Sequence, residues 1–374
     1  MKKTKMFSAL VFLAGFSFLL SCSKESDIIN RGFVADQNKK DNAAVNVKID
    51  QPATVTVLAS GINYPRGLKF GTDGELYVAT AGLGGTNSTQ GQCTQVVPPI
   101  GPYKGGSTAK IIKIDPNGAV TTVAENLPSA VDALGDFEGV ADVAFTGNTL
   151  YALLVAGCSH GNPGTPTSVI KVNPDGTCSV VADLSTFIQN NPVAAPDEGD
   201  FEPDGDPYSM VSVRGDLYVV EANSGQLLRV TTGGSISRVL DFSAHFGHIV
   251  PTSVGYDGNF FVGNLSTFPL VTGNSSIYKI TPAGVVKTWA TGFTGILGVT
   301  FDRQHRMYVL ETSASGFPSP NTGRIVRVNN DNSREVVVDN LTFPTGMTFG
   351  PDGALYISDT GFGPPTGRIL KVTF

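Results

Sequence analysis

A short strand pattern recurs along this chain and restricts the folds open to it. Each copy opens with a bulky apolar residue followed by an aromatic residue, and these two residues begin a strand that ends, except in the second copy, at a polar or turn position. The six copies occupy residues 76–79, 150–153, 217–220, 260–263, 307–310 and 355–358. The last four are spaced by roughly 40 to 50 residues, which is the length of one four-stranded propeller blade. The longer first two intervals indicate insertions.

The remaining sequence supplies the other strands of each repeat. Only 16% of the residues are charged, and 44 glycines and 23 prolines interrupt short alternating segments, which is typical of many short strands. The last repeat ends at Phe374 after three strands, whereas residues 53–58 read as an isolated fourth strand. We therefore predict an all-β six-bladed β-propeller over residues 53–374, with four-stranded blades and the last blade closed by the N-terminal strand.

The first 52 residues predict export and anchoring rather than fold. A basic start and an uncharged apolar run end in Leu19-Leu20-Ser21-Cys22, which resembles a bacterial lipobox. Residues 1–21 are predicted to be a lipoprotein signal peptide, Cys22 the lipidated residue, and 22–52 a flexible tether. This predicts a lipoprotein of a Gram-negative-type cell envelope, held to the outer membrane, periplasmic or surface-exposed. The alternative is ordinary cleavage with an unmodified Cys22.

Three insertions are predicted to share one face of the propeller. They are residues 81–108, 155–167 and 185–206, and all fall after second strands or between blades. We call the face formed by these loops, and by the equivalent loops of the other blades, the insertion face. Long loops on a rigid scaffold commonly carry the binding surface.

Polar and aromatic residues on this face are the candidate ligand-binding residues. Those in loops are Tyr103, His160, His245, His248 and Phe268, and those ending second strands are Glu221, Asn264, Glu311 and Asp359. The strand-end residues would ring the channel mouth, although any propeller has polar residues there. For the histidines, hydrogen-bonding roles are an alternative to metal binding or base catalysis.

The cysteines point to one disulfide. Cys93 and Cys158 lie in equivalent loops of adjacent blades, whereas Cys178 follows a turn on the opposite face. We predict a Cys93–Cys158 bridge in an oxidising compartment, with three free thiols as the alternative.

An acidic loop is a candidate cation site. Asp200, Glu202 and Asp204 precede Gly205 in the alternating pattern that begins a calcium loop. Position twelve of that pattern is Val211, which offers no carboxylate, so a solvated acidic loop is the alternative. Any Ca²⁺ bound here is expected to be structural.

Several scaffold motifs resemble the ScyD/ScyE family of exported NHL-like propellers. They include Pro65-Arg66-Gly67-Leu68, Phe343-Pro344-Thr345-Gly346 and Pro351-Asp352-Gly353. The resemblance spans residues 53–374 and implies fold and export only.

The fold also resembles the six-bladed lactonases, whose catalytic calcium is held where inner strands begin. Those positions here read Arg66, Ala141, Tyr208, Thr252, Leu297 and Thr345. None is a carboxylate or an amide, so that central metal is not expected.

The sequence as a whole predicts a lipid-anchored, monomeric binding scaffold without catalysis. Its partner would be a protein, a glycan or a small molecule at the insertion face. A metal-dependent lactonase or esterase on the same scaffold is the alternative. A formal net charge of −6 without a basic cluster excludes nucleic acid as an expected partner.

Overall fold

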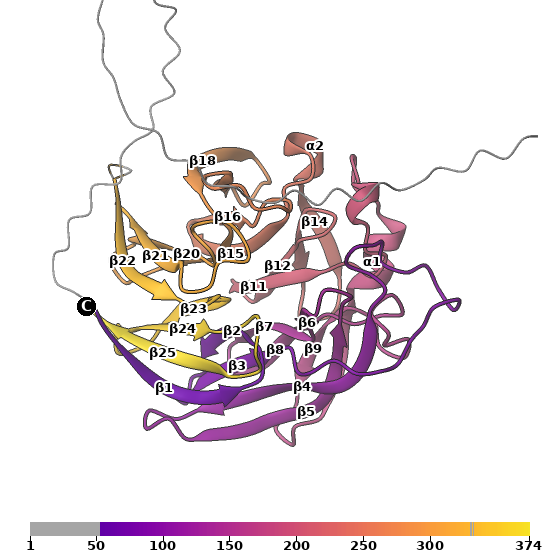
Figure 1. The fold of residues 1–374 in the computed structure, drawn as a ribbon, viewed down its shortest axis with the longest axis horizontal. Helices are drawn as coiled ribbons and strands as arrows, with labels where there is room; N and C mark the ends of the chain where they lie inside the picture. Colours follow the sequence, from indigo (N-terminus) through magenta and orange to yellow (C-terminus); the bar gives the residue numbers. More distant parts are fainter. Residues whose placement is uncertain (1–52, 330, 332) are drawn as a thin grey trace, which may run out of the picture. The chain divides into compact units, whose positions relative to one another are not determined.

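The computed structural model describes residues 53–329, 331 and 333–374, which fold into six β-sheets arranged around a centre (Figure 1). Blade one holds β2 (Pro65–Phe70), β3 (Leu76–Thr80), β4 (Lys104–Ile114), β5 (Val120–Val131) and the short β6 (Phe137–Glu138). Blade two holds β7 (Val140–Thr146), β8 (Thr149–Leu154), β9 (Ser168–Val172) and β10 (Cys178–Asp183). Blade three holds β11 (Pro207–Val213), β12 (Asp216–Glu221), β13 (Gln226–Val230) and β14 (Ile236–Asp241).

The remaining blades repeat the same antiparallel order. Blade four holds β15 (Pro251–Asp257), β16 (Asn259–Asn264), β17 (Ser275–Ile280) and β18 (Val286–Phe293). Blade five holds β19 (Ile296–Phe301), β20 (Met307–Glu311), β21 (Gly323–Val328) and β22 (Arg334–Leu341). Blade six holds β23 (Gly346–Phe349), β24 (Leu355–Asp359), β25 (Gly367–Thr373) and β1 (Thr54–Ile62). The predicted all-β, six-bladed fold is confirmed.

The innermost strands close a ring. Strands β2, β7, β11, β15, β19 and β23 each contact the next, and β23 contacts β2. Apolar side chains from neighbouring blades pack against one another. Leu153 and Val169 of blade two, for example, join Leu217, Val219 and Leu228 of blade three in one buried cluster. The core therefore lies between blades, because each sheet buries its faces against the next sheet.

The N-terminal strand completes blade six as predicted. β1 pairs antiparallel with β25, from Thr54 opposite Thr373 to Ile62 opposite Gly367. The two ends of the described chain thus share one sheet, indigo beside yellow in Figure 1. This pairing covers an edge that would otherwise expose unpaired backbone groups.

Three short helical segments were not predicted. α1 (Leu184–Asn190) follows β10, and its N-cap Asp183 accepts a hydrogen bond from the backbone N–H of Thr186. A single 3₁₀ turn, η1 (Glu198–Asp200), lies in the acidic loop. α2 (Ser243–Phe246) contains His245, which therefore lies in a helix rather than in the predicted loop.

Blade one also departs from the prediction. Its sheet has a fifth strand, because β6 pairs with the extended end of β5 and places Glu138 opposite Ala130. β4 begins at Lys104, so the first insertion is shorter than the predicted 81–108.

The predicted signal peptide (1–21), the lipidated Cys22 and the tether (22–52) lie outside the described residues. Within the described part of the chain, no helix is both long enough and apolar enough to cross a bilayer.

Candidate metal centre at the insertion face

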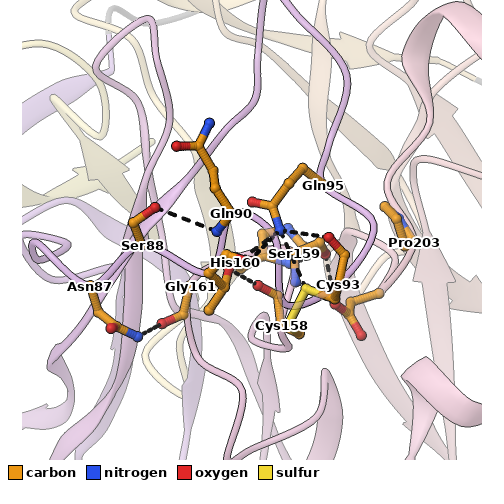
Figure 2. The surroundings of a disulfide bond; sticks show 12 residues. Asn87, Ser88, Gln90, Cys93, Gln95, Cys158, Ser159, His160, Gly161 and Pro203 are labelled. Atoms are coloured by element: carbon orange, nitrogen blue, oxygen red, sulfur yellow. Dashed lines mark hydrogen bonds between the residues drawn. A yellow bond between two sulfur atoms is a disulfide. The ribbon is translucent and has the colours of Figure 1, made fainter.

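A disulfide ties the loops of blades one and two together. Cys93 is bonded to Cys158, with a Cα–Cα distance of 6.3 Å, and Cys178 is unpaired (Figure 2). The predicted pairing is confirmed, and the alternative of three free thiols is wrong. Hydrogen bonds reinforce the contact, because the Thr89 hydroxyl donates to the carbonyl of Cys158 at 2.5 Å.

This joined pair of loops encloses His160. Figure 2 shows His160 and Ser159 directly beside the bridge. The His160 side chain has no solvent exposure, and its Nδ1 atom lies 3.3 Å from the hydroxyl of Ser159. Its other ring nitrogen is therefore turned toward the neighbouring acidic loop and β6.

Two carboxylates converge on that nitrogen. The Nε2 atom of His160 lies 3.1 Å from Oε2 of Glu202 and 3.2 Å from Oε2 of Glu138. Glu138 comes from β6, His160 from the loop after β8, and Glu202 from the loop before β11. Among the described residues, these three offer ligand atoms that all lie within 4.8 Å of one another. We call them the Glu-His-Glu cluster.

Tyr103 fixes the orientation of the Glu-His-Glu cluster. Its hydroxyl donates to Oε1 of Glu138 at 2.6 Å, and its ring centroid lies 4.7 Å from that of His160. Tyr103 is itself buried, so it supports the cluster from the protein side. Tyr103, His160 and Glu202 were each named from the sequence, and the structure brings them together.

The cluster holds more acceptors than donors. A protonated Nε2 atom carries one hydrogen, and in the structure it faces Glu202, which leaves Oε2 of Glu138 buried without a hydrogen-bond donor. A buried carboxylate oxygen without a partner is costly. The arrangement therefore lacks a positive charge or a donor at this point.

The pKa values reflect this imbalance. Burial alone would lower the pKa of His160, but Glu138 and Glu202 raise it well above its ordinary value. Burial raises the pKa of Glu202 to about 7, although the hydrogen bond from His160 opposes the rise. Burial, followed by the charges of Glu138 and Glu202, raises the pKa of nearby Asp206 well above its usual range. A bound cation would favour the ionised forms of Glu202 and Asp206.

The predicted calcium residues do not assemble into one ligand set. Asp200 faces His248, with Oδ2 and Nε2 2.7 Å apart. Asp204 accepts hydrogen bonds from the backbone N–H and hydroxyl of Ser159, at 2.8 and 2.6 Å. Only Glu202 of the three belongs to the Glu-His-Glu cluster.

The strand-end residues are placed as predicted but are buried. Each of these side chains accepts a hydrogen bond from a backbone N–H group. The donors are Asp206 for Glu221 at 3.0 Å, Ser276 for Asn264 at 2.7 Å, Thr294 for Glu311 at 2.5 Å, and Thr342 for Asp359 at 2.8 Å. These bonds hold loops and blade connections onto the strands, a role that the sequence did not indicate. Ligand binding by these residues stays a prediction.

Two other predicted binding residues lie away from the cluster's contacts. His245 lies against Phe246, with ring centroids 5.9 Å apart. Phe268 is 57% exposed, and its ring centroid lies 5.6 Å from that of Phe317. Phe268 thus belongs to an aromatic group on the loops of blades four to six.

The six inner-strand positions expected to hold a central metal carry no carboxylate or amide, although Asp142, the next residue of β7, is a buried acid that lines the central pocket. Arg66, Ala141, Tyr208, Thr252 and Leu297 are the second residues of their strands, and Thr345 directly precedes β23. The Glu-His-Glu cluster instead draws its residues from β6 and from the loops after β8 and before β11.

Part of the chain matches a known family. Residues 207–371 match the family model described as "SMP-30/Gluconolactonase/LRE-like region". The match begins at β11, so all three residues of the Glu-His-Glu cluster lie outside it. No curated protein matches the sequence.

Solved structures share the fold at low sequence identity. A protein of unknown function from Bacteroides thetaiotaomicron is 13% identical, with a TM-score of 0.56, over 86% of this chain and 76% of that one. A gluconolactonase from Xanthomonas campestris is 10% identical, with a TM-score of 0.53, over 86% and 90%. The calcium-binding protein regucalcin from Agrobacterium tumefaciens is 12% identical, with a TM-score of 0.53, over 86% and 95%. At these identities the likeness shows the fold alone.

Proposed function

We propose that this protein is a metal-dependent hydrolase of esters or lactones, with its metal at Glu138, His160 and Glu202. The observation that carries the proposal is the convergence of one imidazole nitrogen and two carboxylate oxygens at 3.1 and 3.2 Å. The gluconolactonase-type family match over residues 207–371 supports the reaction class.

The residues present fit a metal ion. Metal–ligand bonds of about 2.0 to 2.2 Å place neighbouring ligand atoms roughly 3 to 3.5 Å apart. The two carboxylate oxygens lie 3.1 and 3.2 Å from Nε2 of His160, within this range. A cation would also satisfy the orphaned Oε2 atom of Glu138. Because Ca²⁺ prefers oxygen donors alone, the imidazole favours a first-row metal such as Zn²⁺ or Mn²⁺ over the Ca²⁺ expected from the acidic loop.

When bound, such a metal would polarise a carbonyl group and acidify a water molecule. The chain supplies the remaining functions. Tyr103 keeps Glu138 in one orientation through its hydroxyl. Burial and the charges of Glu138 and Glu202 raise the pKa of Asp206, which makes this carboxyl group the candidate for holding the transferred proton.

The balanced reaction is the addition of water across the acyl C–O bond. The water oxygen bonds to the carbonyl carbon, the C–O bond to the alcohol oxygen breaks, and that oxygen receives a proton. One carboxylic acid and one alcohol result, joined in a single product when the substrate is a lactone.

The test is hydrolysis of a lactone and an aryl ester by the protein before and after chelation and metal restoration. Glu202→Gln removes one ligand charge with little change of shape, and Glu198→Gln is the matched control, since Glu198 is an exposed acid of the same loop. We expect turnover that chelator abolishes, that Zn²⁺ or Mn²⁺ restores, and that only Glu202→Gln impairs. Metal binding without turnover would refute the hydrolase proposal and favour the non-catalytic binding scaffold predicted from the sequence.

We also propose that the chain is exported and lipid-anchored through Cys22, in keeping with its resemblance to the ScyD/ScyE propellers. The partner implied is the outer membrane of a Gram-negative-type envelope, with a small-molecule ligand at the insertion face. Metabolic labelling with a fatty acid should mark the wild-type chain and leave Cys22→Ser unlabelled. Equal labelling of the two chains would refute the anchor.

A further inference from the structure

Four phenylalanines form a continuous ridge on the insertion face. Phe268, Phe317 and Phe362 come from the loops after the second strands of blades four, five and six, and Phe343 lies in the connection between β22 and β23. Neighbouring ring centroids are 5.6 Å apart for Phe268 and Phe317, 5.4 Å for Phe317 and Phe343, and 5.8 Å for Phe317 and Phe362. Equivalent loops of three blades thus contribute one aromatic ring each.

The ridge ends at Arg66, beside the candidate metal centre. The guanidinium carbon of Arg66 lies 4.6 Å from the ring centroid of Phe362. Its Nη2 atom donates to the carbonyl of Phe137 and contacts Asp136, and the charge of Glu138 also acts on it. Arg66 therefore contacts both Phe362 of the ridge and Phe137, the neighbour of Glu138 in β6.

One donor of Arg66 is unused. The residue is only 6% exposed, and its Nη1 atom has no hydrogen-bond partner among the described residues. A buried guanidinium N–H group without an acceptor is costly, so the site is incomplete until an oxygen atom reaches it. Phe362 covers one face of the guanidinium, so binding of a ligand at Nη1 would require that ring to move.

The charges around Arg66 favour a neutral ligand oxygen over an anionic one as the acceptor for Nη1. Asp136 already pairs with Arg66, and the charge of Glu138 also acts on Arg66. An anionic ligand would meet these carboxylates, whereas a neutral carbonyl oxygen would not. The ridge meanwhile offers aromatic faces that favour a flat apolar ring over a hydroxylated sugar.

We infer that the substrate is a neutral aromatic lactone or ester, whose ring lies on the phenylalanine ridge and whose carbonyl oxygen accepts a hydrogen bond from Nη1 of Arg66. The inference rests on the proposed function for the reaction class, but the binding of the ring and carbonyl can be measured without turnover.

The experiment is calorimetric titration of the chelator-treated protein with coumarin, a stable neutral aromatic lactone. Coumarin-3-carboxylate supplies a matched anion, and δ-valerolactone supplies a lactone without the aromatic ring. The variants are Phe317→Leu at the centre of the ridge and Arg66→Lys, which keeps the charge but loses the Nη1 donor. Phe374→Leu is the control, because Phe374 is an exposed phenylalanine outside the ridge. Thermal melts verify that each variant folds.

We expect coumarin to bind more tightly than either comparison compound. Phe317→Leu should weaken coumarin binding by about three- to tenfold, Arg66→Lys by about tenfold, and Phe374→Leu should leave it unchanged. Equal or tighter binding of δ-valerolactone or of the anion would overturn the inference. So would wild-type affinity in Arg66→Lys, since Nη1 would then serve a bound water.

Failure of this inference can be told from failure of the proposed function. Coumarin binding without any metal-dependent hydrolysis would support the inferred ligand class and refute the proposed hydrolase function. Hydrolysis of aliphatic lactones by a protein that does not bind coumarin would support the proposed hydrolase function and refute the inferred ligand class.

Discussion

Removal of the Cys93–Cys158 bridge tests how strongly the insertion loops depend on it. The two cysteines are separated by 65 residues. In the chain-entropy treatment, a closed loop of this size stabilises the folded state by about 4 kcal/mol relative to the reduced chain. We therefore expect the double variant Cys93→Ala, Cys158→Ala to lose about 4 kcal/mol in free energy of unfolding.

The assay is urea unfolding followed by circular dichroism, with Cys178→Ala as the control for loss of a thiol. Cys178 is unpaired and half-buried, so its replacement should cost far less. Because His160 follows Cys158 by two residues, the double variant should also bind metal more weakly. A loss below about 1 kcal/mol would refute the reasoning, because the loops would then be ordered without the bridge.

Three further predictions concern closure, a strand end and the acidic loop. Deletion of residues 53–58 removes half of the strand that pairs with β25, so the product should be insoluble or should melt without cooperativity; a soluble, cooperatively melting protein would contradict the closure. Asp359→Ala leaves the Arg368 guanidinium without its 2.8 Å partner and should cost about 3 kcal/mol in urea unfolding, while an unchanged midpoint would show that the bond is dispensable. Burial lowers the pKa of His248, but Asp200 raises it to a net value above the ordinary one, so the stabilisation by this pair is fully present below about pH 6.5 and lost as the pH rises through the raised pKa. The melting temperatures of wild type and His248→Gln should therefore differ most at acid pH and converge at alkaline pH; a constant difference would exclude the ion pair.

The fold was readable from the sequence because its signals are local. Each blade carries its own alternating strand and turn, and Gly353 of the Pro-Asp-Gly turn adopts φ +80°, which glycine accepts without strain. The spare strand at residues 53–58 pointed to ring closure for the same reason. Short segments carried weaker signals. α1 was missed because seven residues show little periodicity, although Asp183 before Leu-Ser-Thr is a recognisable N-cap.

The candidate site was only partly readable because its parts are distant in sequence. Tyr103, His160 and Glu202 were chosen for their chemistry, but nothing local indicated that they meet. The role of Glu138 depends on β6, a two-residue strand that no sequence pattern marks. The alternating acids suggested calcium, yet their backbone turns Asp200 toward His248 and Asp204 toward Ser159.

The central claim is that Glu138, His160 and Glu202 bind a divalent first-row metal. The most direct measurement is the metal content of the purified, dialysed protein by mass spectrometry, in wild type, Glu202→Gln and Glu198→Gln. We predict about one Zn²⁺ or Mn²⁺ per chain in wild type and in Glu198→Gln, and at least a tenfold loss of affinity in Glu202→Gln. Equal metal content in all three proteins, or none in the wild type under metal-replete conditions, would contradict the account.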